Sequence, residues 1–269
     1  MQLITYPDKE GYSSISDRRR ETIKEHVPSQ ASGSVTYDGK KETRNSIPVK
    51  FENVEKQEQA HFDKEYRPIP GGCQMSIVSK GGWATLGTPA YDSVNNEQVW
   101  VTAGHVLDRS SGKELEQAEG TATGCSSTRS IPFEDGDAGL IDAGVDSTSA
   151  RWAIASGSGD YDWDIQGIVY TSRIKDMIAN GEKSRFQGAK TGRSHSQVTD
   201  YFPSSSGSTS GPIVEIDHDS EPGDSGAPYF ELDSDGAYIM GIHDDGSDDE
   251  TRAWGNTMEY IETELNISV

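Results

Sequence analysis

The sequence predicts an all-β protein with two helices, because short apolar runs alternate with turn-forming residues along most of the chain. Clusters of Gly, Ser, Asp and Asn separate these runs, which is typical of short strands joined by tight turns. Regularly spaced strands of this kind favour an antiparallel barrel or a sandwich. The expected strands are residues 75–79, 83–88, 98–104, 138–142, 165–171, 212–216, 227–232 and 237–242.

Two helical segments interrupt the strand pattern. Residues 171–180 are followed by Gly181, a residue type that commonly ends helices. Residues 256–265 place Met258, Ile261 and Leu265 on one face of a C-terminal helix.

The first 68 residues differ from the remainder in composition. They are charged and contain few large apolar side chains, and the composition changes at the sequence PIPGG. A short helix is expected at 16–26 and a strand at 46–54. The chain is therefore expected to consist of an N-terminal pro-segment or accessory subdomain, residues 1–68, and a main domain, residues 69–269.

Charge limits the possible partners. The 269 residues include 24 Lys and Arg against 45 Asp and Glu, a formal net charge of −21. Such a chain repels nucleic acid and anionic membranes, so neither is expected as a partner. An excess of surface carboxylates is screened at molar salt, and we therefore expect a salt-adapted protein, as in extreme halophiles.

The chain shows no membrane segment or export signal in its sequence. The start MQLITYPDKEGYSS lacks a basic, apolar leader, and no run reaches the ~18 apolar residues of a membrane helix. As written, the chain is expected to be cytoplasmic. Cys73 and Cys125 are too few for a disulfide scaffold and lack metal-site spacing, and whether they pair stays open.

Three segments carry residues suited to acyl transfer. Ser225 stands between two glycines in EPGDSGAP, His105 ends the strand-like WVTAGHV, and Asp137 precedes the apolar run AGLI. A serine hydroxyl is a weak nucleophile, so it needs a base, a group that orients the base, and donors for the developing oxyanion. Strand ends in a barrel are places where such side chains converge.

The order His105, Asp137, Ser225 within TAGHV, DAGLI and EPGDSGAP resembles the chymotrypsin-like (trypsin-like) serine proteases. Among them the bacterial streptogrisin and alpha-lytic branch is most similar, since GAKTGRSHSQVT at 188–199 is similar to a Gly- and Thr-rich strand of that branch. The resemblance covers about residues 71–262. It implies two six-stranded antiparallel Greek-key β-barrels with a C-terminal helix, and a haloarchaeal member would fit the charge.

The resemblance also implies a function and the role of each residue. It implies a serine endopeptidase that hydrolyses protein or peptide substrates through an acyl-enzyme, without a cofactor. Ser225 would attack the carbonyl, His105 would carry the proton, and Asp137 would orient His105 as the third member of the catalytic triad. Gly223 and Ser225 would supply the amides of the oxyanion hole. Activity is expected to fall on acidification through the ordinary histidine pKa of about 6.5.

Substrate contacts follow from the same resemblance. GIHDDG, residues 241–246, is similar to the segment that pairs with the substrate backbone, and Gly246 would leave the pocket mouth open. Asp219 lies six residues before Ser225, the spacing of an aspartate that selects Arg or Lys in trypsins. The competing interpretation, which composition favours, is a solvated loop carboxylate.

Several alternatives stay open on sequence grounds. Asp164 is the main rival of Asp137 for the acid, with Asp142 and Asp162 after it. The other histidines, including His195 and His243, are interpreted as structural or solvated, and no metal site is expected because the acidic loops would hold a hard cation only loosely.

The sequence departs from the family at two positions of the site. Val106 stands where many members have a cysteine, and Ala227 replaces the commoner glycine after the serine motif. In animal trypsins, the aspartate that corresponds to Asp224 pairs with a new N-terminal amine after activation. In this sequence no activation motif is evident before the barrel. The family is mostly exported, unlike the expectation for this chain.

Two other functions compete with the endopeptidase. One is a catalytically inactive, protease-like module that binds peptides or regulates a partner. The other is an α/β-hydrolase esterase, which would need the order serine, acid, histidine and a final glycine that GDSGA lacks.

Overall fold

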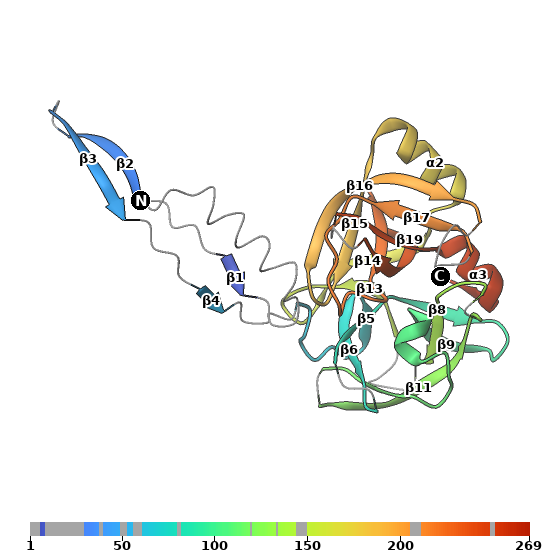
Figure 1. The fold of residues 1–269 in the computed structure, drawn as a ribbon. Helices are drawn as coiled ribbons and strands as arrows, with labels where there is room; N and C mark the ends of the chain where they lie inside the picture. Colours follow the sequence, from blue (N-terminus) through green and yellow to red (C-terminus); the bar gives the residue numbers. More distant parts are fainter. Residues whose placement is uncertain are drawn as a thin grey trace. The chain divides into compact units, whose positions relative to one another are not determined.

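A computed structural model of the chain describes residues 61–269, apart from 80–81, 119, 133, 144–149, 205–210 and 248–250. Of the first 60 residues it describes only the strands at 6–8, 30–37, 40–48 and 53–55. The chain divides into two compact units, Met1–Gln59 and Ala60–Val269, and Figure 1 shows the elements of both.

The first unit contains two pairs of strands. β1 (Tyr6–Asp8) and β4 (Asn53–Glu55) are parallel, and β2 (Gln30–Tyr37) and β3 (Lys40–Pro48) form an antiparallel hairpin. The helix expected at 16–26 lies outside the described residues. The strand expected at 46–54 overlaps the end of β3 and the start of β4. Its central residues, 49–52, lie outside the described residues.

The second unit begins with a closed antiparallel arrangement of strands, here called the first barrel. Its strand order is β7–β6–β10–β11–β12–β9–β8. Because β7 leads into β8 through the single residue Gly87, these two strands together form one of the six strands of the barrel. The strands are β6 (Cys73–Ile77), β7 (Ala84–Leu86), β8 (Thr88–Asp92), β9 (Glu97–Thr102), β10 (Glu114–Glu116), β11 (Ala122–Ser130) and β12 (Gly139–Asp142).

A second ring of strands, the second barrel, follows in sequence. Its order is β18–β15–β16–β17–β20–β19, and an additional pairing of β19 with β18 closes six strands into a ring. The strands are β15 (Lys183–Gly188), β16 (Gly192–Phe202), β17 (Ile213–Ile216), β18 (Pro228–Asp233), β19 (Gly236–Gly246) and β20 (Ala253–Thr257).

Four short strands extend these rings. β14 (Tyr161–Ile168), β13 (Ala150–Ala155) and β5 (Ile69–Gly71) continue the second sheet beyond β19, and β21 (Ile267–Ser268) pairs with β8. The two sheets therefore hold eight and nine strands rather than six each. The all-β, two-barrel fold predicted from the sequence is nevertheless confirmed, because the extra strands are added to the edges of six-stranded rings.

Both predicted helices are present. α2 (Thr171–Asn180) ends at Gly181, which adopts the left-handed conformation (φ 65°) that glycine accepts without strain. α3 (Met258–Leu265) buries Met258, Ile261 and Leu265. These side chains join a hydrophobic cluster with residues of β8, β9 and β12 from the first barrel, of β18 and β19 from the second, and of the adjoining strand β14. The C-terminal helix thus helps to hold the barrels together (Figure 1).

Each barrel also has an apolar cluster of its own. Met75, Leu86 and Trp100 belong to the cluster of the first barrel, and Phe186 and Tyr229 to that of the second. Cys73 and Cys125 are both buried in the first cluster as free thiols. Burial raises the pKa of Cys73 to about 12.

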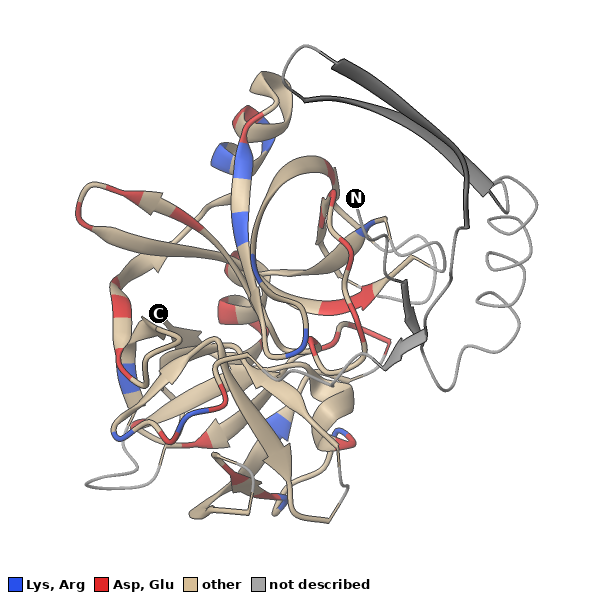
Figure 2. Cartoon of the chain, turned by 90° about the vertical axis from the view of Figure 1, so that its left-hand side faces the viewer, with Lys and Arg blue, Asp and Glu red and all other residues tan. Residues whose placement is uncertain are grey.

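Acidic residues are distributed over strands and turns of both barrels (Figure 2). In the described part of the chain, no helix is long and apolar enough to cross a membrane.

Candidate active site

His105 lies in the segment that follows strand β9 of the first barrel. β9 ends at Thr102, and the chain then forms a short 3-10 turn, Gly104–Leu107, whose flanks are buried. The apolar residues Val106 and Leu107 anchor this turn, while the His105 side chain keeps 39% of its surface exposed. The imidazole is therefore fixed at its base and accessible at its tip.

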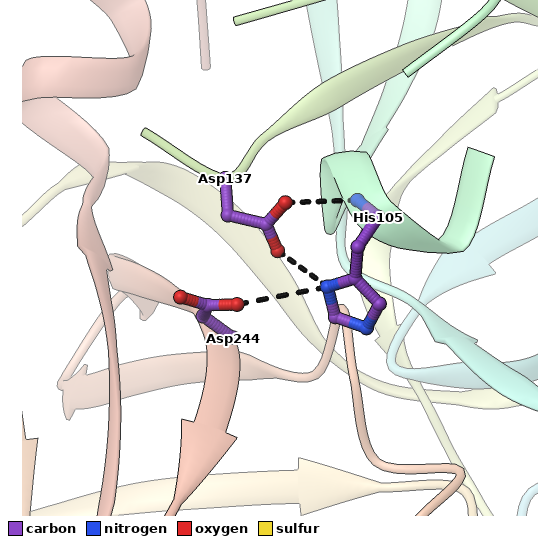
Figure 3. A group of neighbouring side chains, drawn as sticks. All are labelled: His105, Asp137 and Asp244. Carbon is purple, nitrogen blue, oxygen red and sulfur yellow. Dashed lines mark hydrogen bonds and ion pairs between the residues drawn. The ribbon is translucent and has the colours of Figure 1, made fainter. Parts of the chain in front are cut away.

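Asp137 is brought to His105 by strand pairing. β12 pairs with β9 so that Gly139 lies opposite Thr102, which places the residues just before β12 beside the turn that follows β9. The Asp137 carboxylate accepts a hydrogen bond from the His105 backbone amide (2.8 Å) and one from His105 Nδ1 (2.6 Å), as Figure 3 shows. Its side chain is only 3% exposed.

The rival acids lie elsewhere. Asp164 is 59% exposed and pairs with Arg151, Asp162 pairs with Arg193, and Asp142 accepts a hydrogen bond from the backbone amide of Ser126. Of the four aspartates considered from the sequence, Asp137 is the one in contact with the imidazole.

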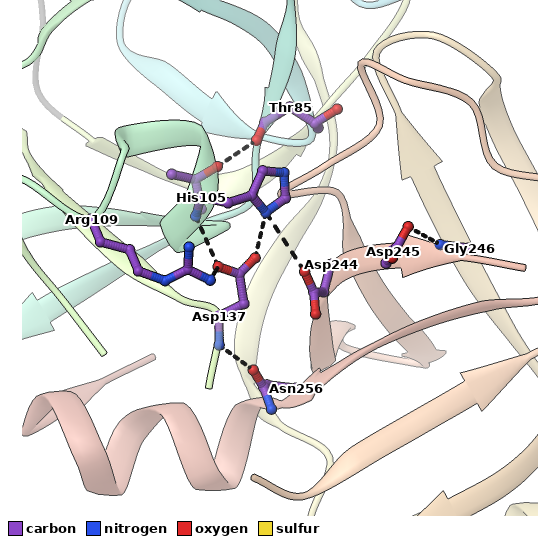
Figure 4. A network of polar contacts seen from close by, with 9 residues as sticks. Thr85, His105, Arg109, Asp137, Asp244, Asp245, Gly246 and Asn256 are labelled. Atoms are coloured by element: carbon purple, nitrogen blue, oxygen red, sulfur yellow. Dashed lines mark hydrogen bonds and ion pairs between the residues drawn. The ribbon is translucent and has the colours of Figure 1, made fainter. Parts of the chain in front are cut away.

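Two residues that sequence reasoning missed support Asp137. Arg109 Nη2 donates to Asp137 Oδ1 at 2.6 Å, and the side chain of Asn256 accepts from the Asp137 backbone amide at 2.7 Å (Figure 4). Arg109 directly follows Asp108, the residue that ends the 3-10 turn containing Val106. An ion pair and hydrogen bonds therefore fix the acid in its place.

A third carboxylate, also missed, approaches the imidazole from the second barrel. Asp244 on β19 places Oδ1 3.6 Å from His105 Nδ1, with a side chain 12% exposed (Figure 3). One ligand atom from each of His105, Asp137 and Asp244 lies within 4.8 Å of the other two. This composition would suit a metal, but the short hydrogen bond from His105 Nδ1 to Asp137 is the geometry of an oriented base.

These neighbours determine the protonation of the pair. Burial lowers the pKa of His105, but the hydrogen bond to Asp137 and the negative charges of Asp137 and Asp244 outweigh it and raise that pKa to about 9. Burial raises the pKa of Asp137, yet the hydrogen bond from His105 and the positive charge of Arg109 leave it below its ordinary value. The sequence-based expectation used the ordinary histidine pKa of about 6.5, and in the structure Asp137 and Asp244 shift the pKa of His105 upward from that value.

Ser225 faces the same pocket as His105. The pocket has a volume of about 330 Å³ and is lined by Ser76, Ile77, Gly82, Trp83, Ala84, His105, Val106 and Ser225. Ser225 is partly buried on the turn before β18. His105 and Ser225, which are distant in sequence, therefore line one pocket, and His105 is also in contact with Asp137.

Backbone conformation and close packing explain why glycines stand at 223 and 226, on the two sides of Ser225. Gly226 has φ 92°, and a Cβ there would lie 2.2 Å from both Thr102 Oγ1 and the carbonyl oxygen of Thr85. Gly223 has φ 114°, a conformation that other residues rarely adopt. Among the described residues, the backbone amides of Gly223 and Ser225 have no hydrogen-bond acceptor. Two donors are thus available beside the serine.

Asp224 holds this turn from the inside. Its side chain is fully buried and accepts hydrogen bonds from the backbone amides of Lys190 (2.8 Å), Thr191 (3.0 Å) and Glu221 (2.9 Å). Burial raises the pKa of Asp224, against the effect of these amides. Backbone donors therefore occupy both oxygens of the Asp224 carboxylate.

The remaining candidates lie around this centre. Asp219 is exposed in the loop between β17 and β18, outside the lining of the 330 Å³ pocket. Gly246 ends β19, and a Cβ there would lie 2.5 Å from Ser220 Oγ, so Gly246 is close to the segment that carries Asp219. His195 is exposed on β16.

His243 is buried behind the site. Tyr229 Oη and His243 Nδ1 are 2.8 Å apart, and Phe186 packs edge-on against the imidazole. Burial lowers the pKa of His243 to about 3, so its side chain is neutral. This agrees with the structural role expected for it.

No model of a known protein family matches the sequence, and no curated relative matches it. Solved structures do resemble the fold. A Nocardiopsis protease aligns with TM-score 0.54 and 18% identity over 74% of this chain and 97% of its own. A glutamic acid-specific serine protease, described as using a histidine triad in substrate binding, aligns with TM-score 0.58 and 19% identity over 75% and 100%.

Thermobifida fusca protease A gives a similar result, with TM-score 0.55 and 15% identity over 74% of this chain and 97% of its own. All three alignments leave about a quarter of this chain unmatched and nearly all of the solved chain matched. Together with the two six-stranded rings and the C-terminal helix, they show that this chain has the chymotrypsin-like protease fold.

Proposed function

We propose that the chain is a serine endopeptidase in which Ser225, His105 and Asp137 act as the catalytic triad. The observation that carries the proposal is the 2.6 Å contact between His105 Nδ1 and the buried Asp137, at the edge of a pocket that also contains Ser225. A carboxylate that orients a base beside a serine is the arrangement that activates a hydroxyl for acyl transfer.

The mechanism follows from the roles of these groups. Ser225 Oγ attacks the carbonyl carbon of the substrate while His105 Nε2 accepts its proton. Asp137 accepts from His105 Nδ1, so it fixes the tautomer and stabilises the imidazolium. The Gly223 and Ser225 amides donate to the oxyanion of the tetrahedral intermediate. His105 then protonates the leaving amine, and water releases the acyl group by the same steps.

Covalent labelling tests this proposal directly. A fluorophosphonate should label the wild-type chain, and Ser225→Ala should abolish labelling. Ser76→Ala is the matched control, because Ser76 lines the same pocket but donates to Glu116 instead of facing a base. It should label at close to the wild-type rate.

The alternative is a catalytically inactive, protease-like module. Absence of labelling in the folded wild-type chain, over KCl concentrations from low to molar, would favour that alternative. Equal labelling of wild type and Ser225→Ala would assign the reactive hydroxyl to another residue.

Gly246 and Asp219 are the proposed substrate contacts. Gly246 ends the strand that also carries Asp244, and its close approach to Ser220 connects it with the loop of Asp219. If Asp219 selects basic side chains, Asp219→Asn should reduce cleavage after Arg and Lys relative to other residues in a peptide library. An unchanged preference would make Asp219 a solvated loop carboxylate, in keeping with its exposure.

The N-terminal segment, proposed as residues 1–68, is a pro-segment or an accessory subdomain. The three backbone amides on Asp224 give that carboxylate its partners without a newly cut N-terminus. We therefore expect the full-length chain to be active. The test is the intact mass of the species that a fluorophosphonate labels: labelling only of a shortened chain would instead show that removal is obligatory.

A further inference from the structure

The charge around His105 does not balance with Asp137 alone. Arg109 donates to Asp137 Oδ1 at 2.6 Å and brings a full positive charge to the carboxylate that faces the imidazole. The pair Arg109–Asp137 is formally neutral, so it stabilises an imidazolium less than an isolated carboxylate would. Another negative group beside the ring would restore that stabilisation.

Asp244 is that group, and a β-bulge directs it. β19 pairs with β20 through His243 opposite Gly255 and Asp245 opposite Trp254, with an irregular register between the two pairs. Asp244 is therefore the extra residue in the bulge, which changes the direction in which a side chain points. The result is a carboxylate of the second barrel 3.6 Å from His105 Nδ1, while Asp245 is exposed.

We propose that Asp244 is a second acid of the candidate active site, which positions His105 and stabilises its charged form together with Asp137. This inference rests on the proposed function. Figure 4 shows the arrangement, in which Asp137, paired with Arg109, and Asp244 both approach Nδ1 of the imidazole. The two acids come from different barrels, so the base is held across the boundary between them.

The charged and titratable groups that face His105 define the expected pH dependence. They are Asp137 and Arg109 from the first barrel, and Asp244 and His243 from the second. Burial keeps His243 neutral, so it contributes no charge near neutral pH. Removing the charge of Asp244 should therefore lower the His105 pKa, because the imidazolium loses a nearby anion while Arg109 remains.

Asp244→Asn should produce a specific change in the pH profile of fluorophosphonate labelling. An opposite charge within 4–6 Å shifts a pKa by about one to three units, so the acid limb should move down by about one unit or more. The rate at high pH should also fall, because a less basic imidazole is a weaker general base. The variant should thus label faster than wild type below the wild-type limb and slower above it, with crossing profiles.

Asp245→Asn is the matched control. It removes the same charge from the adjacent residue of β19, but Asp245 is exposed and accepts from the backbone amide of Gly246. Its acid limb should lie at the same pH as that of the wild type at fixed KCl concentration. A loss of rate in Asp244→Asn without a shift of the acid limb would overturn the proposal, because a structural defect lowers the rate at every pH.

A second readout does not depend on activity. NMR titration of the His105 ring in Ser225→Ala, assigned by the signal that His105→Gln removes, should show a lower pKa once Asp244→Asn is added. If the fluorophosphonate does not label the wild-type chain but Asp244→Asn still lowers the His105 pKa, the proposed function is wrong and the inference that Asp244 stabilises the charged imidazole is supported. If the chain labels normally and the pKa stays unchanged, the inference about Asp244 fails alone.

Discussion

Arg109 is the residue on which the buried acid most depends. Asp137 is 3% exposed, and Arg109 Nη2 lies 2.6 Å from its carboxylate, as a cationic partner in addition to the imidazole. The ionised carboxylate has a lowered pKa in the folded chain. It therefore stabilises the fold above the unfolded-state pKa of about 3.9, and this contribution is lost as the pH falls through the folded-state pKa.

Arg109→Gln should consequently destabilise the protein at neutral pH. Loss of a hydrogen bond to a charged group, partly exposed on the arginine side, should cost about 1.5–3 kcal/mol. The difference from wild type should be largest near pH 7 and should shrink as the pH falls below about 4, where Asp137 becomes protonated in the unfolded chain. Urea unfolding at a series of pH values measures it.

Lys113→Gln provides the comparison for Arg109→Gln. Lys113 pairs with Asp108 at 3.2 Å in the same region, but the Asp108 side chain is 45% exposed. An exposed pair contributes about 0–1 kcal/mol, so this variant should be nearly as stable as wild type. Equal losses in the two variants would show that Arg109 does not act through the buried carboxylate.

Some of these site residues can be predicted from sequence patterns and others cannot, and the difference has a physical cause. His105, Asp137 and Ser225 stand in motifs at strand ends, so a local pattern was enough to propose them. Asp244 stands in HDDG beside another aspartate, and simple strand alternation does not apply because the strand bulges there. Arg109 and Asn256 join the site only through contacts between segments far apart in sequence.

At the scale of elements, Asp224 connects the turn of Ser225 to the loop between β15 and β16. Lys190 and Thr191 in that loop donate to one carboxylate oxygen, and Glu221 on the turn donates to the other. The buried carboxylate thereby fixes the backbone whose amides, at Gly223 and Ser225, are proposed to bind the oxyanion. Both oxygens are needed as acceptors.

Asp224→Asn should therefore loosen both segments. An asparagine keeps one acceptor oxygen and presents an NH₂ group to an amide donor, which leaves a buried donor unsatisfied at a cost of about 1–3 kcal/mol. We expect lower stability in urea and slower fluorophosphonate labelling. Asp217, on the same connection between β17 and β18, is exposed, so Asp217→Asn should change neither the stability nor the labelling rate. Labelling of Asp224→Asn at the wild-type rate would show that the turn of Ser225 keeps its conformation without this carboxylate.

The strands that could be predicted are those whose buried residues form an apolar run in the sequence. β12 and β17 have nearly continuous buried residues, and both were expected. β11 and β16 expose much of their length and are rich in Ser, Thr and Gly, so neither shows an apolar run. The β16 region was noticed only through its resemblance to a known strand, and β13, β15 and β10 were not expected from apolar runs.

At the scale of the whole molecule, the two barrels share one cluster of buried side chains, which α3 completes. The proposed site lies where residues of both barrels meet, since Asp137 belongs to the first and Asp244 to the second. Its integrity therefore depends on the barrels keeping their packing. Against that packing acts the repulsion of an acidic surface, with a formal net charge of −21 over the full sequence.

Salt should relieve this repulsion, so the protein is expected to be more stable in KCl. The Debye length falls from about 10 Å at 0.1 M to about 3 Å at 1 M, and screening over that range removes most repulsion between surface carboxylates. The free energy of unfolding in urea should accordingly rise steeply up to about 1 M KCl and flatten above it. A rise that continues in proportion to concentration would indicate general salting-out instead, and full stability without added salt would contradict salt adaptation. Fluorophosphonate labelling followed in parallel should gain most over the same interval, because the two acids on His105 come from barrels that must stay packed together.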